Sequence, residues 1–568
     1  MIKGIPVSEG YAIGKAYHYH DQQLDTSKRH IDQPSLEIDF FHDAIEKTVK
    51  QLDELIIKSS KDFGEETSKI FEAHRLIAQD PDLVKAVEKK ITEESCNMLY
   101  ALKSVSDSYV SMFEKLEDPY LKERSLDLVD VTKRMMRNAL NLSSDQMVLP
   151  KREMILIADE LTPSQIASIQ LKYVKGIITK TGGKTSHSAI IAKLLGIPAI
   201  MGVDLVFEKT HHHQEIIMDA FIGEIYINFD YQIKSDYLYK TERFLSYKES
   251  LKSLVHRPST SNDGQSYLLT GQIGSSKDVL HVIENGADGV GLFRTEFLFI
   301  NRNNAPSEEE QYEEYKSVLL SMFPKPVIIR TIDIGGDKQT PYLKSHDELN
   351  PSLGLRAIRL SIYHQTLIYH QLKALLRASI HGHLKIMFPM VATIEEVYMI
   401  KQWIKDIQIE FDANDIKYAQ FEIGVMIEIP SAALMANDFA KEVDFLSIGT
   451  NDLIQYTFAA DRTNQALDYL YRPFSPAIIK LIHMTAKAAH EHHKSISVCG
   501  EMASDMLAMP LLLGLGINEL SMTPTMILKA KEFVLSHSHQ SFVDAANHIL
   551  TLDSEKEILI HLKKQFQS

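Results

Sequence analysis

The pattern of hydrophobic and polar positions changes character along the chain. Residues 1–20 and 146–230 carry short apolar runs between glycines and other turn residues, which is typical of strands in an α/β domain. Residues 36–142 are charged, poor in glycine and periodic at helical spacing. One face of that region is apolar at i, i+4, i+7 and i+11, through Ile45, Val49, Leu52 and Ile56. The pattern predicts several antiparallel helices inserted between two parts of one α/β domain.

A proline and a cluster of turn residues mark two further boundaries. Asp80-Pro81 predicts a turn or helix start inside the helical region, because the residue before a proline disfavours the helical conformation. A polar, tyrosine-bearing helical stretch leads into HRPSTSNDGQ, which is typical of a hinge. The sequence therefore predicts four parts: an α/β domain of residues 1–20 plus 143–230, an inserted helical subdomain at 21–142, a linker helix at 231–258 and a last domain at 259–568.

Strand-like and helix-like segments alternate through the last domain. Eight segments have the character of strands: YLLTGQI, GVGLFRT, PVIIRTID, LKIMFPM, EIGVMIEI, DFLSIGT, SISVCG and ELSMTP. Eight β-α units favour a closed parallel barrel over the alternative, a doubly wound open sheet. The expected fold class is multidomain α/β, with an α/β domain that holds an inserted α-helical subdomain, followed by a (β/α)8 barrel of the TIM type.

Composition and charge exclude several classes of protein. The chain has 568 residues and a formal net charge of -15, which suits a nucleic-acid binder poorly because phosphate binding needs a basic face. Two cysteines, Cys96 and Cys499, rule out a disulfide framework. No run reaches the roughly 18 apolar residues of a membrane span, and the first residues lack the apolar stretch of a signal peptide. We therefore expect a soluble cytoplasmic protein.

Polar residues follow nearly every predicted strand of the barrel. The clearest are Arg294, Arg330, Glu428, Asn451 with Asp452, and Cys499. Any one of them has a plain structural explanation, because an arginine at a strand end is usually a solvated or structural ion pair. Together they are harder to dismiss, since the carboxyl ends of all barrel strands meet at one mouth, where the active sites of such barrels lie.

The residue types at this mouth predict a ligand. Two arginines from neighbouring strands can hold a phosphate through paired donors. Arg356 and Arg462 follow other strands and could add positive charge. Carboxylates from two adjacent strands can bind Mg²⁺, which prefers oxygen ligands and normally accompanies phosphates. The sequence thus predicts a phosphorylated small acid held with Mg²⁺.

A second group of candidate residues lies in TGGKTSHSAIIAKLLGIP. Gly182-Gly183 permit a tight turn, and Thr185 is a good N-cap for the helix that the following apolar run predicts. His187 would lie at the start of that helix, where free amides favour an anionic group such as a phosphoryl. The residues alone leave open whether His187 is a nucleophile or only a capping side chain. A nucleotide-binding P-loop is excluded, because Ile178 stands where its first glycine is required.

These motifs together resemble a known family. GGKTSHSAIIAKLLGIPAIMG is similar to the phosphohistidine motif of the phosphoenolpyruvate–protein phosphotransferases, the enzyme I of the bacterial sugar phosphotransferase system. The family's barrel motifs follow in the family's order: GLFRTEFL, PVIIRTIDIGGDK, NPSLGLRAIR, IMFPMVAT, MIEIPSAAL, SIGTNDLIQYT, DRTNQ and CGEMASD. FEAHRLIAQDPDL resembles the helical segment that receives the partner carrier protein. The resemblance covers essentially the whole chain.

The resemblance implies a role for each matched position. His187 matches the histidine phosphorylated on Nε2, Cys499 the acid that protonates the departing enolate, and Thr162 a residue that steadies the histidine. Thr185 would support the same loop. Glu428 and Asp452 match the Mg²⁺ ligands. The matched phosphoenolpyruvate contacts are Arg294, Arg330, Arg356, Asn451, Asp452 and Arg462.

The implied activity is a two-step transfer. The phosphoryl group of phosphoenolpyruvate passes to His187 with release of pyruvate, and then to a histidine of the phosphocarrier protein HPr, which initiates sugar uptake. The two encounters need different poses, so we expect a rigid-body swing of the histidine domain about the linker near 231–258. The family also implies a homodimer formed through the barrel.

Two alternatives and a few departures qualify this interpretation. An ATP-linked dikinase or phosphoenolpyruvate synthase would need a large nucleotide-binding domain, for which the helical region is too short. A specialised or regulatory paralogue that serves a dedicated carrier is the closer alternative.

The sequence departs from the family's motifs at three places. Lys184 replaces the usual arginine, GQIGSS replaces the usual first-strand motif, and VSEG replaces an N-terminal serine-proline-glycine. His211-His212-His213 is expected to be a loop and not a metal site.

Overall fold

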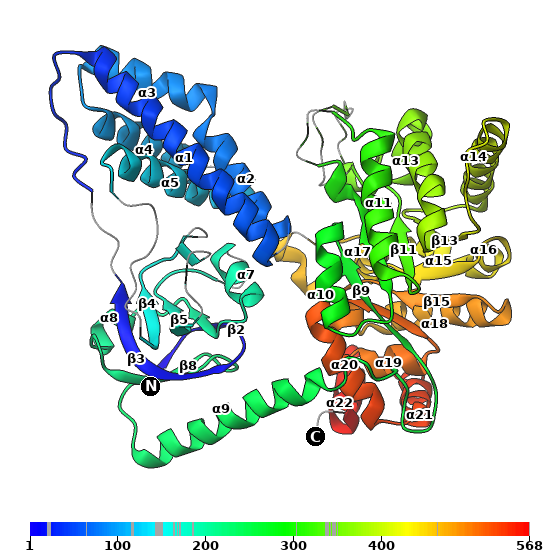
Figure 1. Cartoon of the computed structure of the whole chain (residues 1–568). Coiled ribbons are helices and arrows are strands. Elements are labelled where there is room, and N and C mark those ends of the chain that lie inside the picture. The colour runs from blue at the N-terminus through cyan, green and yellow to red at the C-terminus, as the bar shows by residue number, and fades with distance from the viewer. Residues whose placement is uncertain are drawn as a thin grey trace. The chain divides into compact units, whose positions relative to one another are not determined.

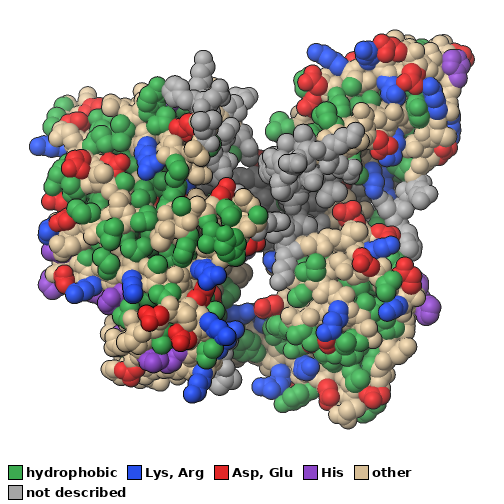
Figure 2. Space-filling view, turned by 180° about the vertical axis from the view of Figure 1, so that it is seen from behind, with side chains coloured by type: hydrophobic (Ala, Val, Ile, Leu, Met, Phe, Trp, Pro, Cys, Tyr) green, Lys and Arg blue, Asp and Glu red, His purple; other side chains and the backbone are tan. Residues whose placement is uncertain are grey.

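The chain forms two compact units, residues 1–248 and 249–568, and each is described by itself (Figure 1). The computed structural model describes residues 1–19, 24–63, 65–114, 119–142, 152–162, 165–166, 169, 172–183, 187–300, 302, 304–335, 340, 342–343, 348, 350–462 and 464–566. Within these ranges, the side chains of residues 58–63, 65–69, 114, 119–126, 187–188, 190, 194 and 465 are not described. On the face shown in Figure 2, acidic, basic and apolar side chains are interspersed over the described surface.

The first unit is built on an eight-stranded sheet of order β1-β8-β7-β3-β4-β5-β6-β2. Its strands are β1 (Ile2–Lys3), β2 (Ile5–Ser8), β3 (Tyr11–Tyr19), β4 (Met154–Ala158), β5 (Val174–Thr179), β6 (Ala199–Met201), β7 (Glu215–Asp219) and β8 (Glu224–Tyr226). Strand β3 pairs parallel with β4 and antiparallel with β7, so the first strands of the chain join the later ones in one sheet. Everything between β3 and β4 is therefore an insertion into this sheet.

The insertion is a bundle of helices. They are α1 (Pro34–Phe63), α2 (Glu65–Ala78), α3 (Pro81–Glu94), α4 (Met98–Glu114) and α5 (Pro119–Ala139). Leu52 of α1 is fully buried in the bundle core, and Ile45, Val49 and Ile56 pack against that core, as the helical periodicity predicts. Asp80 begins α3, because its carboxylate accepts hydrogen bonds from the amides of Asp82 and Leu83.

Among the described residues, this part of the chain also contains α7 (His187–Leu194), α8 (Val206–Lys209) and α9 (Tyr231–Lys252). Aromatic rings of α9 pack on the sheet and on the turn that follows β7, with centroids 5.9 Å apart for Tyr11 and Tyr237 and 5.2 Å apart for Phe221 and Phe244. The Tyr237 hydroxyl also donates to Asp219 Oδ2 at 3.0 Å. The division between the two units falls near the end of α9, after Lys248.

The second unit is a closed barrel of eight parallel strands in the order β10-β11-β12-β13-β14-β15-β16-β9. The strands are β9 (Leu268–Ile273), β10 (Val290–Arg294), β11 (Pro326–Arg330), β12 (His383–Phe388), β13 (Glu422–Ile427), β14 (Phe445–Ile448), β15 (Ser495–Val498) and β16 (Glu519–Met522). Seven lie within the segments that the sequence predicted as strands, and β12 begins one residue before its predicted segment. The predicted barrel is confirmed, and with it the multidomain α/β fold class.

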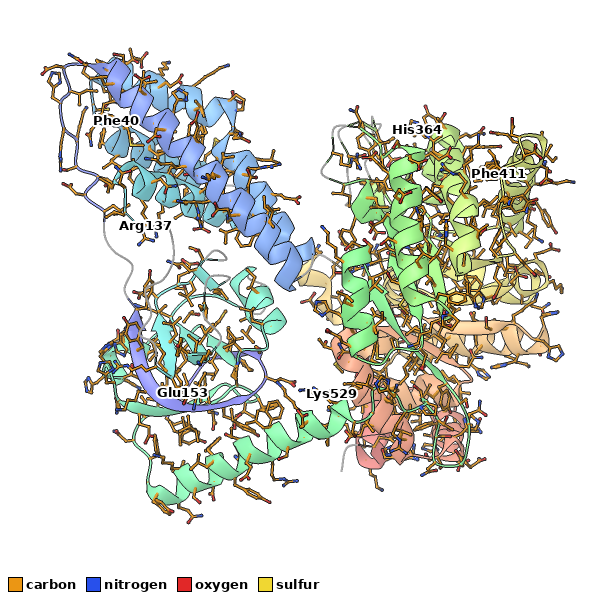
Figure 3. The ribbon with its side chains drawn as sticks, in the orientation of Figure 1. Phe40, Arg137, Glu153, His364, Phe411 and Lys529 are labelled. Carbon is orange, nitrogen blue, oxygen red and sulfur yellow. The ribbon has the colours of Figure 1, made fainter. Side chains whose placement is uncertain are left out.

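Helices surround this barrel (Figure 1). They are α10 (Val279–Glu284), α11 (Glu308–Met322), α12 (Ile358–Tyr363), α13 (Gln365–Ala378), α14 (Ile394–Ala413), α15 (Pro430–Leu434), α16 (Ala436–Glu442), α17 (Thr450–Phe458), α18 (Pro476–Glu491), α19 (Met509–Gly514), α20 (Pro524–Ser536), α21 (His539–Ile549) and α22 (Glu555–Phe566). Outward-facing strand residues such as Leu446 and Ile448 share a core with helix residues such as Phe411 of α14, which Figure 3 labels. Inward-facing residues from alternate positions, including Phe445 and Met426, fill the interior.

Candidate active site at the barrel mouth

The carboxyl ends of the barrel strands carry the candidate residues, as the sequence predicted. Arg330 is the last residue of β11, Glu428 follows β13 directly, and Cys499 follows β15. Asp452 lies in the first turn of α17, which begins two residues after β14. Because all eight strands are parallel, these side chains emerge at the same end of the barrel.

Arg330 is held by acidic side chains. Its Nη2 donates to Glu296 Oε1 at 2.7 Å and lies 3.2 Å from Asp333 Oδ2. Burial opposes the charge on this guanidinium, but Glu296, Asp333 and Glu428 raise its pKa above the ordinary arginine value. Arg330 is therefore a fixed positive charge, oriented before any ligand arrives.

Arg356 lies between two aspartates and bonds both. Its Nε and Nη2 donate to the oxygens of Asp333 at 2.8 and 3.1 Å, and its Nη1 and Nη2 donate to those of Asp452 at 3.0 and 3.2 Å. All three side chains are nearly inaccessible to solvent. Burial lowers the pKa of Arg356, and the two carboxylates more than offset that effect and raise it. The predicted substrate contact thus also ties the end of β11 to the start of α17.

Glu428 is fully buried among like charges. The amide of Met390 donates to its Oε1 at 2.6 Å. Burial raises the pKa of Glu428 to about 8, helped by Asp452 and Asp333, while Arg356 and Arg330 act in the opposite direction. A Cβ atom at Gly449 would lie 2.8 Å from Glu428 Oε2, so a glycine is needed beside this carboxyl. Two further carboxylates, Asp452 and Asp333, therefore lie close enough to Glu428 to disfavour its charged form.

Cys499 lies against a second strand and faces the barrel interior. The Ser447 hydroxyl donates to its Sγ at 3.4 Å, and the thiol lies 3.6 Å from the carbonyl oxygen of Ile448. Burial raises the pKa of the Cys499 thiol to about 11, although the Ser447 hydrogen bond and the charge of Arg330 lower it. The side chain is therefore protonated at neutral pH. Gln272 of β9 donates to the Cys499 carbonyl at 2.9 Å and anchors its backbone.

The remaining predicted contacts lie at the rim of the same mouth and are partly exposed. Arg294 ends β10, with its guanidinium carbon 5.0 Å from the ring centre of Phe297. Asn451 accepts a hydrogen bond from the amide of Glu501 at 2.9 Å, which ties the start of α17 to the residue two after Cys499. Arg462 follows α17, and its amide donates to the Gln455 side chain at 3.2 Å.

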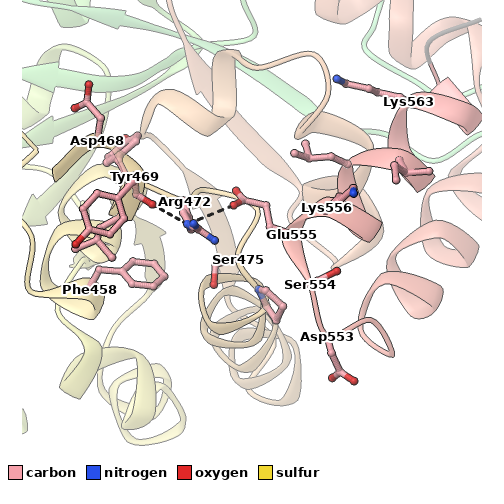
Figure 4. Close-up of a pocket in the computed structure, with 15 residues that line it drawn as sticks. Phe458, Asp468, Tyr469, Arg472, Ser475, Asp553, Ser554, Glu555, Lys556 and Lys563 are labelled. Carbon is pink, nitrogen blue, oxygen red and sulfur yellow. Dashed lines mark hydrogen bonds and ion pairs between the residues drawn. The ribbon is translucent and has the colours of Figure 1, made fainter. Parts of the chain in front are cut away.

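A separate groove of about 910 Å³ lies beside the segment that follows Arg462 (Figure 4). Its walls come from residues 468–476, after the predicted site, and from residues 553–563 around α22. Arg472 crosses between the walls, since its Nε donates to the Tyr469 carbonyl at 2.7 Å and lies 3.9 Å from Glu555 Oε2. None of the predicted catalytic or binding residues lines this groove, and its acidic and basic side chains are mixed.

The loop before α7 is the second predicted site. His187 is the first residue of α7, so its backbone lies at a helix N-terminus as predicted. Gly182 has φ of +106°, which a residue with a side chain rarely adopts and which accounts for a glycine there. The side chain of His187, together with Lys184 and Thr185, lies outside the described residues.

Thr162 and Gln165 exchange two hydrogen bonds between their side chains and their backbone amides. Its amide donates to Gln165 Oε1 at 2.9 Å, and the amide of Gln165 donates back to Thr162 Oγ1 at 3.3 Å. This exchange is the capping box that the sequence T-P-S-Q encodes. The Thr162 side chain is thereby fixed in orientation.

Two acidic residues at the mouth were not predicted from the sequence to have a role in binding or catalysis. Glu296 lies two residues after Arg294, and Asp333 lies three residues after Arg330. Both follow predicted strands, which is the same signal that identified the arginines. Their function in the structure is to orient Arg330 and Arg356, which no pattern of spacing reveals.

The described residues hold no ready-made cluster of metal-binding side chains. No group of three or more histidine, cysteine or acidic side chains in this part of the chain, the barrel mouth included, is arranged to hold a metal ion. His211, His212 and His213 lie in the loop between α8 and β7, where the Arg152 guanidinium contacts the ring of His213 at 2.8 Å. Within the same part of the chain, no helix is long and apolar enough to cross a membrane.

Comparison with known proteins places the chain in a family. Three family models match the chain: the N-terminal domain of PEP-utilising enzymes at residues 3–124, their mobile domain at 150–223 and their PEP-binding domain at 248–539. These matches define the class as PEP-utilising enzymes.

Relatives over the full length narrow that class. The phosphoenolpyruvate-protein phosphotransferase of Priestia megaterium is 42% identical over 566 residues, which cover 100% of this chain and 99% of the relative. That of Bacillus subtilis (strain 168) is 42% identical over 571 residues and covers 100% of both chains. A solved structure, described as the NMR solution structure of Enzyme I (nEIt) protein, is 36% identical over 43% of this chain and 99% of its own, with a TM-score of 0.37. The chain belongs to the phosphoenolpyruvate-protein phosphotransferase family, as its motifs indicated.

Proposed function

We propose that this chain takes the phosphoryl group of phosphoenolpyruvate onto Nε2 of His187, releases pyruvate, and passes the phosphoryl group to a histidine of an HPr-type carrier protein. The observation that carries this proposal is the barrel mouth, where Arg330 and Arg356 are held by acidic side chains near a protonated Cys499. Phosphoryl transfer depends on positioned positive charge more than on covalent chemistry by the protein, and this mouth supplies such charge.

The arginines bind the substrate in this proposal. Arg330 and Arg356 are locked by Glu296, Asp333 and Asp452, so little reorganisation is needed when an anion enters. Arg294 and Arg462 lie at the more exposed rim and would meet the phosphate and carboxylate first. Asn451 would add a neutral donor from the start of α17. The phosphorus–oxygen bond of phosphoenolpyruvate breaks as the bond between phosphorus and His187 Nε2 forms.

Glu428 and Asp452 fit a Mg²⁺ ion. Burial, and after it the charges of Asp452 and Asp333, raise the pKa of Glu428 to about 8, and a divalent cation at this place would favour the charged carboxylate instead. Two protein carboxylates are the usual contribution to a Mg²⁺ whose other ligands are substrate oxygens and water. When bound, the ion would neutralise charge on the transferred phosphoryl group. The Met390 amide bonds only Oε1 of Glu428, and each oxygen of Asp452 accepts one hydrogen bond from Arg356, so both carboxylates keep lone pairs that a metal ion could use.

Cys499 would complete the first reaction. The enolate left by phosphoryl transfer needs a proton on its methylene carbon to become pyruvate, and the thiol is protonated because burial raises its pKa to about 11. The sulfur–hydrogen bond breaks, a carbon–hydrogen bond forms, and the negative charge passes to sulfur. Thr162 and Thr185 would orient His187 in the first unit, and the Thr162 cap gives that role a physical basis.

We also propose the domain limits and a rigid-body swing of the histidine domain between the two half-reactions. The proposed domains are 1–20 plus 143–230, 21–142, 231–258 and 259–568. Support for a hinge comes from the way α9 is held at its two ends. As far as Phe244, it packs on the first unit through the rings of Tyr237 and Phe244. Three residues after its end, the carbonyl of Val255 accepts a hydrogen bond from the buried Lys531 ammonium, which also donates to the carbonyl of Gly286. The residues between these anchors, about 245–252, are the place where a hinge would bend.

The partners and location follow from the family. We propose a phosphocarrier that docks on the bundle near the FEAHRLIAQDPDL segment of α2 and α3, a homodimer formed through the barrel, and a cytoplasmic location. Both cysteines, Cys96 and Cys499, are buried free thiols, which suits a reducing compartment. The acceptor could instead be a dedicated carrier of a specialised pathway.

Radiolabelled phosphoenolpyruvate tests the proposal directly. With Mg²⁺, the wild-type chain should acquire an acid-labile label, and His187→Ala should acquire none. The labelled protein is then offered to a panel of histidine-bearing carriers, and HPr should accept the label fastest. An unlabelled wild type would refute the proposed activity, and label acquired from ATP alone would point to a dikinase or synthase. Transfer to one other carrier in preference to HPr would identify a specialised paralogue.

A further inference from the structure

Two serine hydroxyls form a hydrogen-bonded chain that ends on the sulfur of Cys499. Ser497 Oγ donates to Ser447 Oγ at 2.8 Å, and Ser447 Oγ donates to Cys499 Sγ at 3.4 Å. Ser447 and Ser497 face each other in the register of β14 and β15. Ser447 is fully buried, and Ser497 is 2% exposed. Both donors therefore point in one direction, from the barrel interior toward the thiol.

The strands place these hydroxyls where apolar side chains would normally fill a barrel. On β14, Leu446 and Ile448 pack outward into the large core shared with the helices, while Ser447 alternates with them and faces inward. The thiol itself shares a small interior cluster with Leu292, Ile328, Met387, Met426 and Phe445. A thiolate in such surroundings is costly unless donors are aimed at it, because burial disfavours the charged form.

We propose that Ser447, supported by Ser497, is a positioning residue for proton donation by Cys499. This inference rests on the proposed role of Cys499 as the acid in pyruvate formation. As the sulfur–hydrogen bond breaks and a carbon–hydrogen bond forms at the methylene carbon, negative charge moves from the enolate to sulfur. The Ser447 hydrogen bond strengthens as that charge grows, so it stabilises the transition state more than the ground state. The Ser447 hydrogen bond also fixes which side of the sulfur stays open to the substrate.

The neighbouring strand β16 offers a matched control. Ser521 is also fully buried in the barrel interior, but its hydroxyl makes no hydrogen bond to any residue that the structure describes. Ser447→Ala, Ser497→Ala and Ser521→Ala each remove one buried hydroxyl from the same region of the barrel. They differ in whether that hydroxyl reaches the thiol directly, through one neighbour, or not at all.

The experiment measures kcat and KM for pyruvate formation from phosphoenolpyruvate, with the full-length chain, Mg²⁺ and excess carrier protein. Ser447→Ala should lower kcat by about 10- to 100-fold, the range expected when a hydrogen bond to a charged group is lost, and should leave KM nearly unchanged. Ser497→Ala should have a smaller effect, and Ser521→Ala should match wild type. The double variant of Ser447 and Ser497 should be no slower than Ser447→Ala, since the two act in series.

A double-mutant cycle with Cys499→Ala separates this inference from the proposed function. If Ser447 acts through the thiol, Ser447→Ala should slow the wild-type background and have no further effect in the Cys499→Ala background. Equal slowing in both backgrounds, or equal effects of Ser447→Ala and Ser521→Ala, would overturn the positioning role. A Cys499→Ala variant as fast as wild type would instead refute the proposed acid. Thermal unfolding of every variant identifies any loss that comes from misfolding.

Discussion

The barrel mouth and the loop before α7 fix their polar groups in opposite ways. At the mouth, Arg356 is held by Asp333 and Asp452, which lie 23 and 96 residues away along the chain. Beside α7, Thr162 is held by Gln165, only three residues away. The mouth is thus a product of the closed barrel, which brings distant strand ends together, while the cap around Thr162 is encoded locally. A short sequence motif is therefore enough to encode the two hydrogen bonds between Thr162 and Gln165, whereas the bonding at the mouth depends on which strand ends the barrel brings together.

The largest expected effect comes from removing the central cation of the mouth. Arg356→Ala would remove the guanidinium that pairs with the buried Asp452 and would leave Asp333 with Arg330 as its remaining arginine partner, which costs about 3–5 kcal/mol of unfolding free energy. It should also lower kcat/KM for phosphoenolpyruvate by about 100- to 1000-fold, because a preorganised donor is lost. Urea unfolding and steady-state kinetics measure the two effects.

Arg359 provides the control for this variant. It lies three residues further along, and its guanidinium donates to the carbonyls of Leu353 and Gly354 instead of to a carboxylate. Arg359→Ala should change the unfolding free energy by about 0.5 kcal/mol or less. Equal destabilisation by the two variants would show that the ion pairs of the mouth do not hold it together.

The next prediction concerns how the free energy of unfolding depends on pH, and it involves Glu428 at the barrel mouth. Burial raises the pKa of Glu428 to about 8, so in the absence of Mg²⁺ the folded chain keeps a proton that the unfolded chain releases near its ordinary value of 4.5. The contribution of Glu428 to the free energy of unfolding is fully present below about pH 4.5, and it is lost as the pH rises toward 8. Glu428→Gln should flatten this part of the profile of unfolding free energy against pH. Metal-free urea unfolding between pH 5 and 8 measures it, and an unchanged slope in the variant would contradict the assignment.

The smallest effect belongs to the local cap. Thr162→Ala removes the hydroxyl that accepts from the Gln165 amide and should cost about 1 kcal/mol, felt in its own loop. Hydrogen exchange at the amides of Gln165 and Ile166 should accelerate by about fivefold, whereas Thr162→Ser keeps the acceptor and should not accelerate it. Acceleration at the barrel amides as well would show that the two sites are not built independently.

Much of this structure follows from periodicity and turn chemistry. Each of the eight barrel strands coincides with an alternating or apolar segment of the sequence, and Asp80-Pro81 begins α3 as the pair predicts. Such signals are local, so one sequence is enough to detect them. The insertion of the bundle was also predictable, because the first and later strands share one composition.

The bonding inside the mouth was less predictable for a physical reason. Nothing in the sequence indicates that Asp333 accepts from Arg356 and lies near Arg330, or that Glu296 orients Arg330, since these partners depend on how the strand ends meet. The same is true of Ser447, whose hydroxyl is notable only because Cys499 lies beside it on the next strand. The division within α9, near Lys248, is likewise not marked by any break in the helical pattern.

The pairing of β3 with β4 has a consequence for how this protein can change. The two strands are adjacent and parallel, with Lys15 opposite Met154 and Tyr19 opposite Ala158, so a connection has to cross over from the end of one to the start of the other. The whole helical bundle occupies the place of that single crossover. In topological terms it is an exchangeable module: another crossover of any size that joins the same two strand ends would preserve the sheet. If the proposed carrier docks on this bundle, its recognition can diverge separately from the phosphoryl chemistry within one continuous chain.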